Sequence, residues 1–213
     1  MDSSTDQRVT PEAPADGATH APTRRAVIDV GTNSVKILIA EINCREIHPL
    51  LEESEQTRLG RGFYETRKLQ PDAVHATAKA VARFALVAKS WHASHTRVVA
   101  TSAARDATNS SDLTSAIEEA SGLSVEVISG EQEASWVFQG ICTDPRLAGK
   151  PLLIVDVGGG STEFILGQDC EQFFQQSFPI GTVRLIEMLP VSDPPRTGEL
   201  AATRAWIRDF LAG

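Results

Sequence analysis

A strand–turn–strand pattern that occurs twice constrains this chain more than any other feature. The clearer copy, residues 152–166, has an apolar run that ends in an aspartate, then three glycines, two hydroxyl residues, a glutamate and a second apolar run. Short apolar runs bounded by glycine predict β-strands. Because glycine has no Cβ, the backbone N–H groups of such a turn can approach a ligand closely and form an anion-binding site.

The other copy lies 127 residues earlier, the offset from Asp29 to Asp156. The same offset aligns Gly31 with Gly158, and apolar residues match on both sides of the two turns. One such turn is readily explained as a plain hairpin with no ligand. Two equivalent copies indicate a duplicated unit. We therefore expect the two turns to face each other across a cleft and to bind one polyanion from both sides.

The residues of the two turns divide into two groups of expected ligands. Asp156 and Glu163 place carboxylates on either side of the second turn. Mg²⁺ prefers oxygen ligands, keeps most of its waters and bridges to phosphate, so this pair predicts a site for Mg²⁺ or another divalent cation. The residues expected to bind phosphate are Gly31, Thr32, Asn33, Ser34, Gly158, Gly159, Gly160, Ser161 and Thr162.

The sequences Asp-Val-Gly-Thr-Asn-Ser (29–34) and Asp-Val-Gly-Gly-Gly-Ser-Thr-Glu (156–163) resemble the paired phosphate motifs of the actin-like ATPase and sugar-kinase superfamily. They are most similar to those of the Ppx/GppA phosphatases, the exopolyphosphatases and guanosine pentaphosphate phosphohydrolases. Residues 99–107, 125–134 and 178–185 resemble three further segments of that family. The resemblance implies an α/β fold, with a ribonuclease H-like (actin-like ATPase) lobe and an incomplete second lobe of the same type.

The resemblance also implies roles for Glu133 and Arg105. Glu133 matches the family's catalytic glutamate, although sequence physics alone does not separate it from Glu131, because glutamates in a first helical turn ordinarily interact with the helix dipole. Arg105 follows a predicted strand at 97–101, and ligands of open α/β sheets bind outside the carboxyl ends of strands. Its guanidinium could bind phosphate through two hydrogen bonds. A surface arginine at a helix start is the alternative.

Composition and the positions of turn-forming residues predict the organisation of the chain. Residues 1–24 have almost no large apolar side chains and predict a disordered tail. Residues 25–147 are assigned to the first lobe and residues 148–213 to a partial second lobe, because residues 144–151 are polar and rich in turn formers. Two-domain members of the family continue beyond such a point. We therefore expect this chain to be C-terminally truncated or to be completed by a partner.

The charge and the cysteines exclude several classes of protein. A formal net charge of −8, from 28 acidic and 20 basic residues, argues against binding of long nucleic acids. No apolar run approaches the ~18–20 residues of a membrane span, so no membrane association is expected. Cys44, Cys142 and Cys170 lack the spacing of a zinc site and are expected to be reduced thiols in a cytoplasmic protein.

Three functions remain open from the sequence. The first is a hydrolase that releases phosphate from the end of inorganic polyphosphate, or from guanosine pentaphosphate, by Mg²⁺-assisted attack of water. The second is an ATP-dependent sugar-kinase-like enzyme or ATPase of the same superfamily, although residues 129–134 favour the phosphatases. The third is a catalytically incomplete fragment that binds phosphate or polyphosphate. A homodimer is also considered, since an incomplete second lobe would expose apolar surface.

Overall fold

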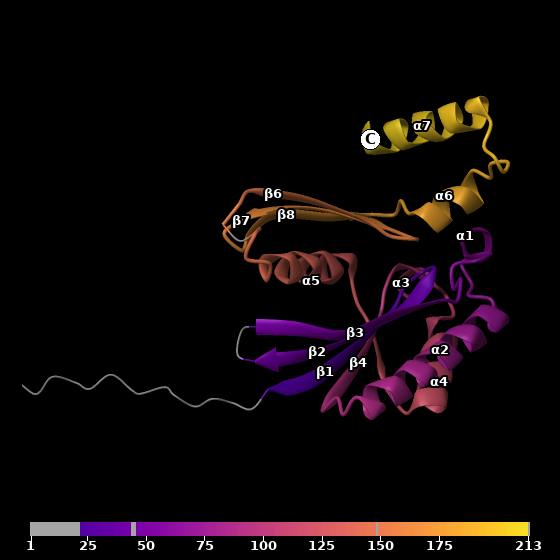
Figure 1. Ribbon diagram of the computed structural model, residues 1–213. Coiled ribbons are helices and arrows are strands. Elements are labelled where there is room, and N and C mark those ends of the chain that lie inside the picture. Colours follow the sequence, from indigo (N-terminus) through magenta and orange to yellow (C-terminus); the bar gives the residue numbers. More distant parts are fainter. Residues whose placement is uncertain (1–21, 44–45, 148, 213) are drawn as a thin grey trace, which may run out of the picture.

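The computed structural model describes residues 22–43, 46–147 and 149–212, and Figure 1 shows their two β-sheets, one above the other. The first sheet has the strand order β3-β2-β1-β4-β5 and the second has the order β6-β7-β8. The strands are β1 (Thr23–Val30), β2 (Ser34–Asn43), β3 (Glu46–Gln56), β4 (His95–Ala100), β5 (Val125–Val127), β6 (Leu152–Val157), β7 (Thr162–Gln168) and β8 (Glu171–Phe178). This mixed arrangement confirms the predicted α/β fold class.

Each sheet starts with the same antiparallel meander. β2 pairs with β1 and β3, and β7 pairs with β6 and β8, all antiparallel. In the first sheet, β4 then pairs with β1 in parallel and β5 pairs with β4 in parallel. The helices are α1 (Phe63–Thr66), α2 (Pro71–Ser90), α3 (Ser102–Asp106), α4 (Ser110–Ser121), α5 (Gly130–Cys142), α6 (Thr182–Met188) and α7 (Thr197–Ala212).

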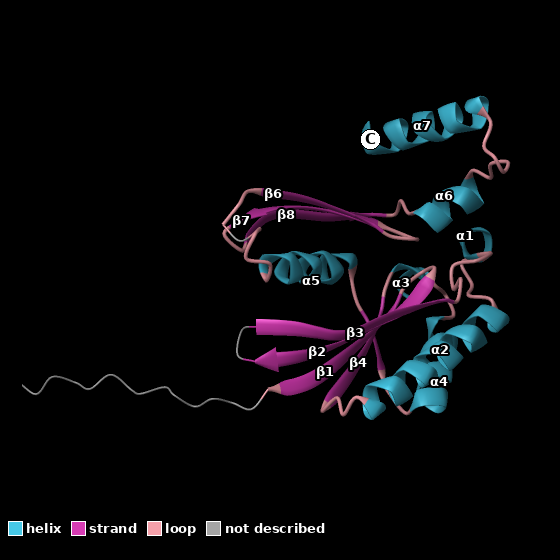
Figure 2. Ribbon diagram, in the orientation of Figure 1, coloured by secondary structure: helices cyan, strands magenta, loops and turns pink. Residues whose placement is uncertain are grey.

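The main hydrophobic core lies between the first sheet and the helices α2 and α4, which pack side by side (Figure 2). Alternate residues of β1 and β2, such as Ile28 and Ile37, point into it and are fully buried. Phe84 of α2 and Ile117 of α4 cover them. Burial of each such side chain stabilises the fold by about 1.5–3 kcal/mol. This core therefore supports β1 and β2, the two strands that the first turn connects.

The second sheet packs on α5, which lies between the two sheets (Figure 1). Ala134 and Phe138 of α5 bury Ile165 of β7. On the opposite face, Phe178 of β8 contacts Phe210 of α7, with ring centroids 6.5 Å apart. Residues 130–142 were assigned to the first lobe from the sequence, whereas their helix contacts β7 and β8. The division of the chain into domains at residue 147 stays a prediction.

The prediction of a disordered tail over residues 1–24 is wrong for its last two residues. Thr23 and Arg24 begin β1, where Thr23 pairs with Ile42 of β2. Arg24 donates a hydrogen bond to the carbonyl of Trp91, 3.3 Å away, and these contacts extend the strand into the segment that was predicted to be disordered. Residues 1–21 lie outside the described residues. Among the helices that the structure describes, none combines the length and apolar character needed to cross a bilayer.

Candidate active site

The two predicted turns have the same local structure. In the first, Gly31 N donates to Ser34 O at 3.0 Å; in the second, Gly158 N donates to Ser161 O at 2.9 Å. A Cβ added to either glycine would lie 3.1 Å from the carbonyl oxygen that its N–H contacts. The equivalence expected from the 127-residue offset is therefore present in the hydrogen bonding.

The carbonyl groups of the first turn are bound by the segment that follows β3. Thr32 O accepts from Gly60 N at 2.8 Å. Asn33 O accepts from Thr57 N at 3.1 Å and from Arg58 N at 2.8 Å. These bonds fix the turn from the side of its oxygen atoms.

The second turn is bound in the corresponding way by the start of α6. Gly159 O accepts from Val183 N at 2.9 Å and from Arg184 N at 3.1 Å. Gly160 O accepts from Arg184 Nε at 2.8 Å. The first amides of α6 have no partner within their own helix, so the turn supplies their acceptors.

The N–H groups of both turns are left free by this arrangement. No hydrogen bond found within the described residues uses the N–H of Thr32, Asn33, Gly159 or Gly160 as its donor. Unpaired backbone N–H groups are strong donors, and several of them together form an anion-binding concavity. The two turns can therefore offer their donors to one ligand.

Both turns line one cavity of about 150 Å³. Ten of the residues predicted to form the site lie in its wall, namely Gly31, Thr32, Asn33, Ser34, Glu133, Asp156, Gly158, Gly159, Gly160 and Ser161. An adjoining cavity of about 230 Å³ is lined by Arg105 and Arg184 and shares Ser102 and Ser161 with the first. The Ser102 hydroxyl is buried and has no hydrogen-bond partner among the described residues, so it adds a donor where the cavities meet.

Glu133 lies in the first turn of α5, which begins at a capping residue. Ser129 Oγ accepts from Gln132 N at 3.1 Å and fixes the start of the helix. The Glu133 side chain is 20% exposed, and its Oε2 lies 3.3 Å from Nη1 of Arg105. Burial first, and then the charge of Glu163, raise the pKa of Glu133 to about 7, although Arg105 opposes the shift. A carboxylate with a pKa near neutrality is suited to accept a proton.

Glu131 has a different environment, although it is only two residues away. Its side chain is exposed, and a hydrogen bond from its own backbone, followed by one from Ser129, lowers its pKa. The structure thus distinguishes two glutamates that the sequence left equivalent.

The raised pKa of Glu133 predicts a pH-dependent stability in metal-free protein. Between its ordinary value of 4.5 and about 7, the folded state binds more protons at Glu133 than the unfolded state, so the free energy of unfolding falls as the pH rises through this window. The loss reaches at most about 3 kcal/mol, from 1.36 kcal/mol per pKa unit. Urea unfolding in EDTA should show this slope in the wild type. Glu133→Gln should make the slope smaller, because Glu163 and Asp29, whose pKa values are also raised, still contribute to it. An unchanged slope would contradict the assignment.

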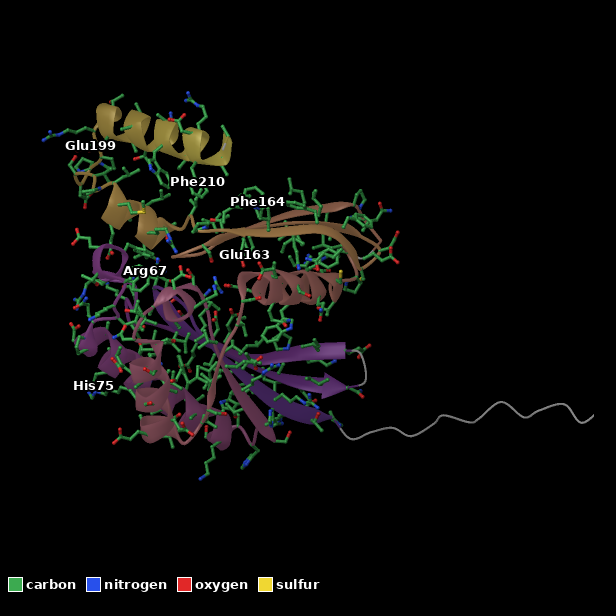
Figure 3. The ribbon with its side chains drawn as sticks, turned by 180° about the vertical axis from the view of Figure 1, so that it is seen from behind. Arg67, His75, Glu163, Phe164, Glu199 and Phe210 are labelled. Atoms are coloured by element: carbon green, nitrogen blue, oxygen red, sulfur yellow. The ribbon has the colours of Figure 1, made fainter. Side chains whose placement is uncertain are left out.

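Three carboxylates that could hold a cation lie at the ends of the two hairpins. Glu163 is 1% exposed, accepts a hydrogen bond from Ser177 Oγ at 2.7 Å, and lies across the ladder from Asp156. Figure 3 shows Glu163 on the side of the second sheet that faces α5, with Phe164 on the opposite side. Burial raises the pKa of Glu163 first, and Asp156 adds to the shift.

Asp29 is the third carboxylate, and its Oδ1 is buried without a hydrogen-bond partner among the described residues. Burial raises its pKa; Lys36 opposes the shift and Asp156 adds to it. A buried carboxylate oxygen without a partner is costly, and a cation would satisfy it. The described residues contain no cluster of three or more metal-binding side chains, but Mg²⁺ needs only one or two carboxylates beside phosphate and water. The donors present therefore fit Mg²⁺.

Three predicted residues, Thr162, Arg105 and Glu163, do not line the first cavity. Thr162 Oγ1 donates to Ile180 O at 2.6 Å and so holds the second sheet. Arg105 lies in the wall of the adjoining cavity, where its Nη1 also donates to Ile128 O at 2.9 Å. Glu163 is almost fully buried and lines neither cavity.

Sequence reasoning missed Asp29 as a ligand and Arg184 as part of the site. The alignment of Asp29 with Asp156 was an available signal. For Arg184 the sequence offered only the resemblance of residues 178–185 to a segment of the family. Its role depends on contacts with residues that are distant in the sequence. Its Nη2 lies 2.7 Å from Asp106 Oδ2, and its guanidinium lies 4.5 Å from the ring centre of Tyr64. It therefore connects the second turn to α1 and α3.

Comparison with known proteins gives consistent similarity. The profile of the Ppx/GppA phosphatase family matches residues 38–213. Exopolyphosphatase 2 of Mycobacterium tuberculosis is 39% identical over 200 residues, 90% of this chain and 62% of that protein. The guanosine-5'-triphosphate,3'-diphosphate pyrophosphatase of Pseudoalteromonas translucida is 32% identical over 162 residues, 76% of this chain and 32% of that protein.

The fold is also shared with solved structures. The crystal structure of an exopolyphosphatase from Cytophaga hutchinsonii superposes with a TM-score of 0.83 at 31% identity, over 89% of this chain and 61% of that one. The chain thus spans about 62% of the length of the mycobacterial relative and a similar share of the solved structure.

Proposed function

The chain belongs to the Ppx/GppA phosphatase family, and we propose that it is a phosphoanhydride hydrolase that releases phosphate from the end of inorganic polyphosphate or from guanosine pentaphosphate. One observation carries the proposal. Two equivalent turns with free N–H groups face a single cavity, and a half-buried carboxylate with a pKa of about 7 lies in its wall. The names of the relatives, an exopolyphosphatase and a guanosine pyrophosphatase, agree with both substrate classes.

In this proposal each turn binds phosphate groups through backbone donors. The N–H groups near Thr32 and Gly159 hold successive phosphates, and Arg105 binds the chain where it leaves the first cavity. Such positioning and charge stabilisation account for most of the catalysis of phosphoryl transfer. A protein with a net charge of −8 can bind a polyanion in this way, because local donors, not the net charge, set the potential in the cleft.

Glu133 acts as the general base. It orients a water molecule toward the terminal phosphorus atom and accepts a proton from it as the new P–O bond forms. Asp156 and Glu163, with Asp29 beside them, would hold Mg²⁺ directly or through water. The bound ion would neutralise the charge that develops on the phosphate oxygens.

The proposal is tested by phosphate release from long-chain polyphosphate and from guanosine pentaphosphate, with Mg²⁺ and after its removal with EDTA. Release from at least one substrate that stops with EDTA and returns with added Mg²⁺ supports the hydrolase. A folded protein that binds polyphosphate but releases nothing would support the phosphate-binding alternative. ATP-dependent transfer to a sugar, without polyphosphate hydrolysis, would support the kinase-like alternative.

Arg184→Lys is expected to lower phosphate release by about tenfold. Lysine keeps the positive charge but cannot bind Gly160 O and Asp106 together or stack on Tyr64 as the planar guanidinium does. The effect should be measured as kcat/KM on polyphosphate. Arg83→Lys is the matched control, because Arg83 pairs with Glu53 and Glu55 on the surface and should leave the rate unchanged. Equal rates for both variants would contradict a positioning role for Arg184.

Two further parts of the proposal concern the setting of the enzyme. We expect a cytoplasmic protein, in line with the cysteine usage of the sequence. We also expect self-association, because apolar side chains on the outer face of the second sheet are exposed, among them Leu153, Val155 and Phe174. Sedimentation at increasing concentration would reveal a homodimer, and a constant monomer mass would exclude it.

A further inference from the structure

Two free thiols lie where the end of α5 meets the tip of the β7–β8 hairpin. Cys142 is the last residue of α5 and is half-buried, and Cys170 is exposed in the two-residue turn between the strands. Asp169 and Cys170 both adopt positive φ angles, 53° and 60°, which is the backbone of a tight hairpin turn. The position of Cys170 is therefore fixed, because the residue belongs to a tight turn of two residues and not to a long loop.

The packing of α5 brings the two thiols together. Phe138, one helical turn before Cys142, presses against Gly167 near the same hairpin tip, where an added Cβ would lie 2.3 Å from its ring. Cys142 joins the small cluster that Phe138 forms with Ala134 and Ile165. Burial raises the pKa of the Cys142 thiol to about 11, and the neighbouring Cys170 adds to the shift.

We propose that Cys142 and Cys170 are a redox modification site that forms a reversible intramolecular disulfide on exposure to peroxide. The exposed Cys170 thiolate attacks the O–O bond of hydrogen peroxide, which gives a sulfenic acid and releases hydroxide. The sulfur of Cys142 then attacks the sulfenic sulfur; the S–S bond forms, and the hydroxyl leaves as water with the proton of Cys142. Two thiols and one peroxide thus give one disulfide and two water molecules, and an added thiol reductant reverses the reaction.

The bond would join α5 to the second sheet. Glu133 lies nine residues before Cys142 on the same helix, about 13 Å along its axis, so the link restrains the element that carries the proposed base. The inference does not depend on the proposed activity, because the bond can be detected without turnover. A link across residues 142–170 should raise the melting temperature by about 5–10 °C.

Peptide mapping tests the inference directly on the whole chain. After peroxide treatment and blocking of free thiols, trypsin places Cys44, Cys142 and Cys170 in three different peptides, residues 37–45, 106–146 and 147–184. We expect a linked 106–146/147–184 pair that reductant separates. In a mixture of ¹⁴N and ¹⁵N protein, an intramolecular bond should give only pairs in which both peptides carry the same isotope.

Matched variants separate this bond from other oxidation. Cys170→Ser should lose the linked peptide and the rise in melting temperature, whereas Cys44→Ser should keep both. Oxidation of Cys170 to sulfenic or sulfinic acid with no linked peptide would overturn the proposal. Links to the Cys44 peptide in place of the 106–146/147–184 pair would overturn it as well. So would linked pairs that join a ¹⁴N peptide to a ¹⁵N peptide.

Discussion

Glu133→Gln is expected to lower phosphate release from polyphosphate by about 10³-fold and to leave the affinity for polyphosphate within about threefold of the wild type. The amide has nearly the same shape as the carboxyl group but cannot accept a proton from water, and general-base catalysis typically contributes 10²–10⁴-fold. Binding should persist because the N–H groups of the two turns, and not Glu133, hold the phosphates. The loss should appear in kcat with little change in KM.

The control for this variant is Glu131→Gln. Both residues lie in the first turn of α5, so the two substitutions remove the same charge from the same end of the helix dipole. Glu131 is exposed, and its pKa is lowered, so it lacks the burial that suits a base. Near wild-type activity of Glu131→Gln beside an inactive Glu133→Gln would assign the role. Loss of polyphosphate binding in a folded Glu133→Gln protein would place the residue in binding instead.

The turns and their pairing could be predicted from the sequence because their signal is local. Gly31 and Gly158 stand at corresponding places between apolar runs, and a strand–turn–strand hairpin follows from such a pattern without knowledge of the rest of the chain. Asp156 and Glu133 followed from the same hairpins and from the resemblance. For this reason ten of the predicted residues line one cavity.

Other features depend on contacts between distant segments and left no local pattern. Residues 57–60 and the start of α6 donate backbone hydrogen bonds to the carbonyl groups of the two turns. These bonds join distant parts of the chain that share no common motif. The pKa of Glu133 depends on its burial and on the charges of Glu163 and Arg105, which belong to other elements. The packing of α5 on the second sheet depends on Phe138 meeting Gly167, a contact between residues with no distinguishing spacing.

Gly181→Ala is expected to reduce both phosphate release and polyphosphate affinity by about 10²-fold or more. A Cβ at this position would lie 2.4 Å from the carbonyl carbon and oxygen of Gly159 and from the nitrogen of Gly160. These are backbone atoms of the second turn and cannot rotate away, so the turn or α6 must shift. A displacement of about 1 Å is enough to lose roughly 10²-fold in a positioned reaction.

The reason lies in close approach and not in backbone strain, because Gly181 has φ of −149°, an extended conformation open to alanine. Gly140→Ala is the matched control: its Cβ would meet nothing within 4 Å, and alanine within α5 should raise stability by about 0.5–1 kcal/mol. Isothermal titration with polyphosphate, alongside thermal melting, distinguishes a shifted turn from an unfolded protein. A folded Gly181→Ala protein with wild-type affinity would show that the second turn binds phosphate independently of α6.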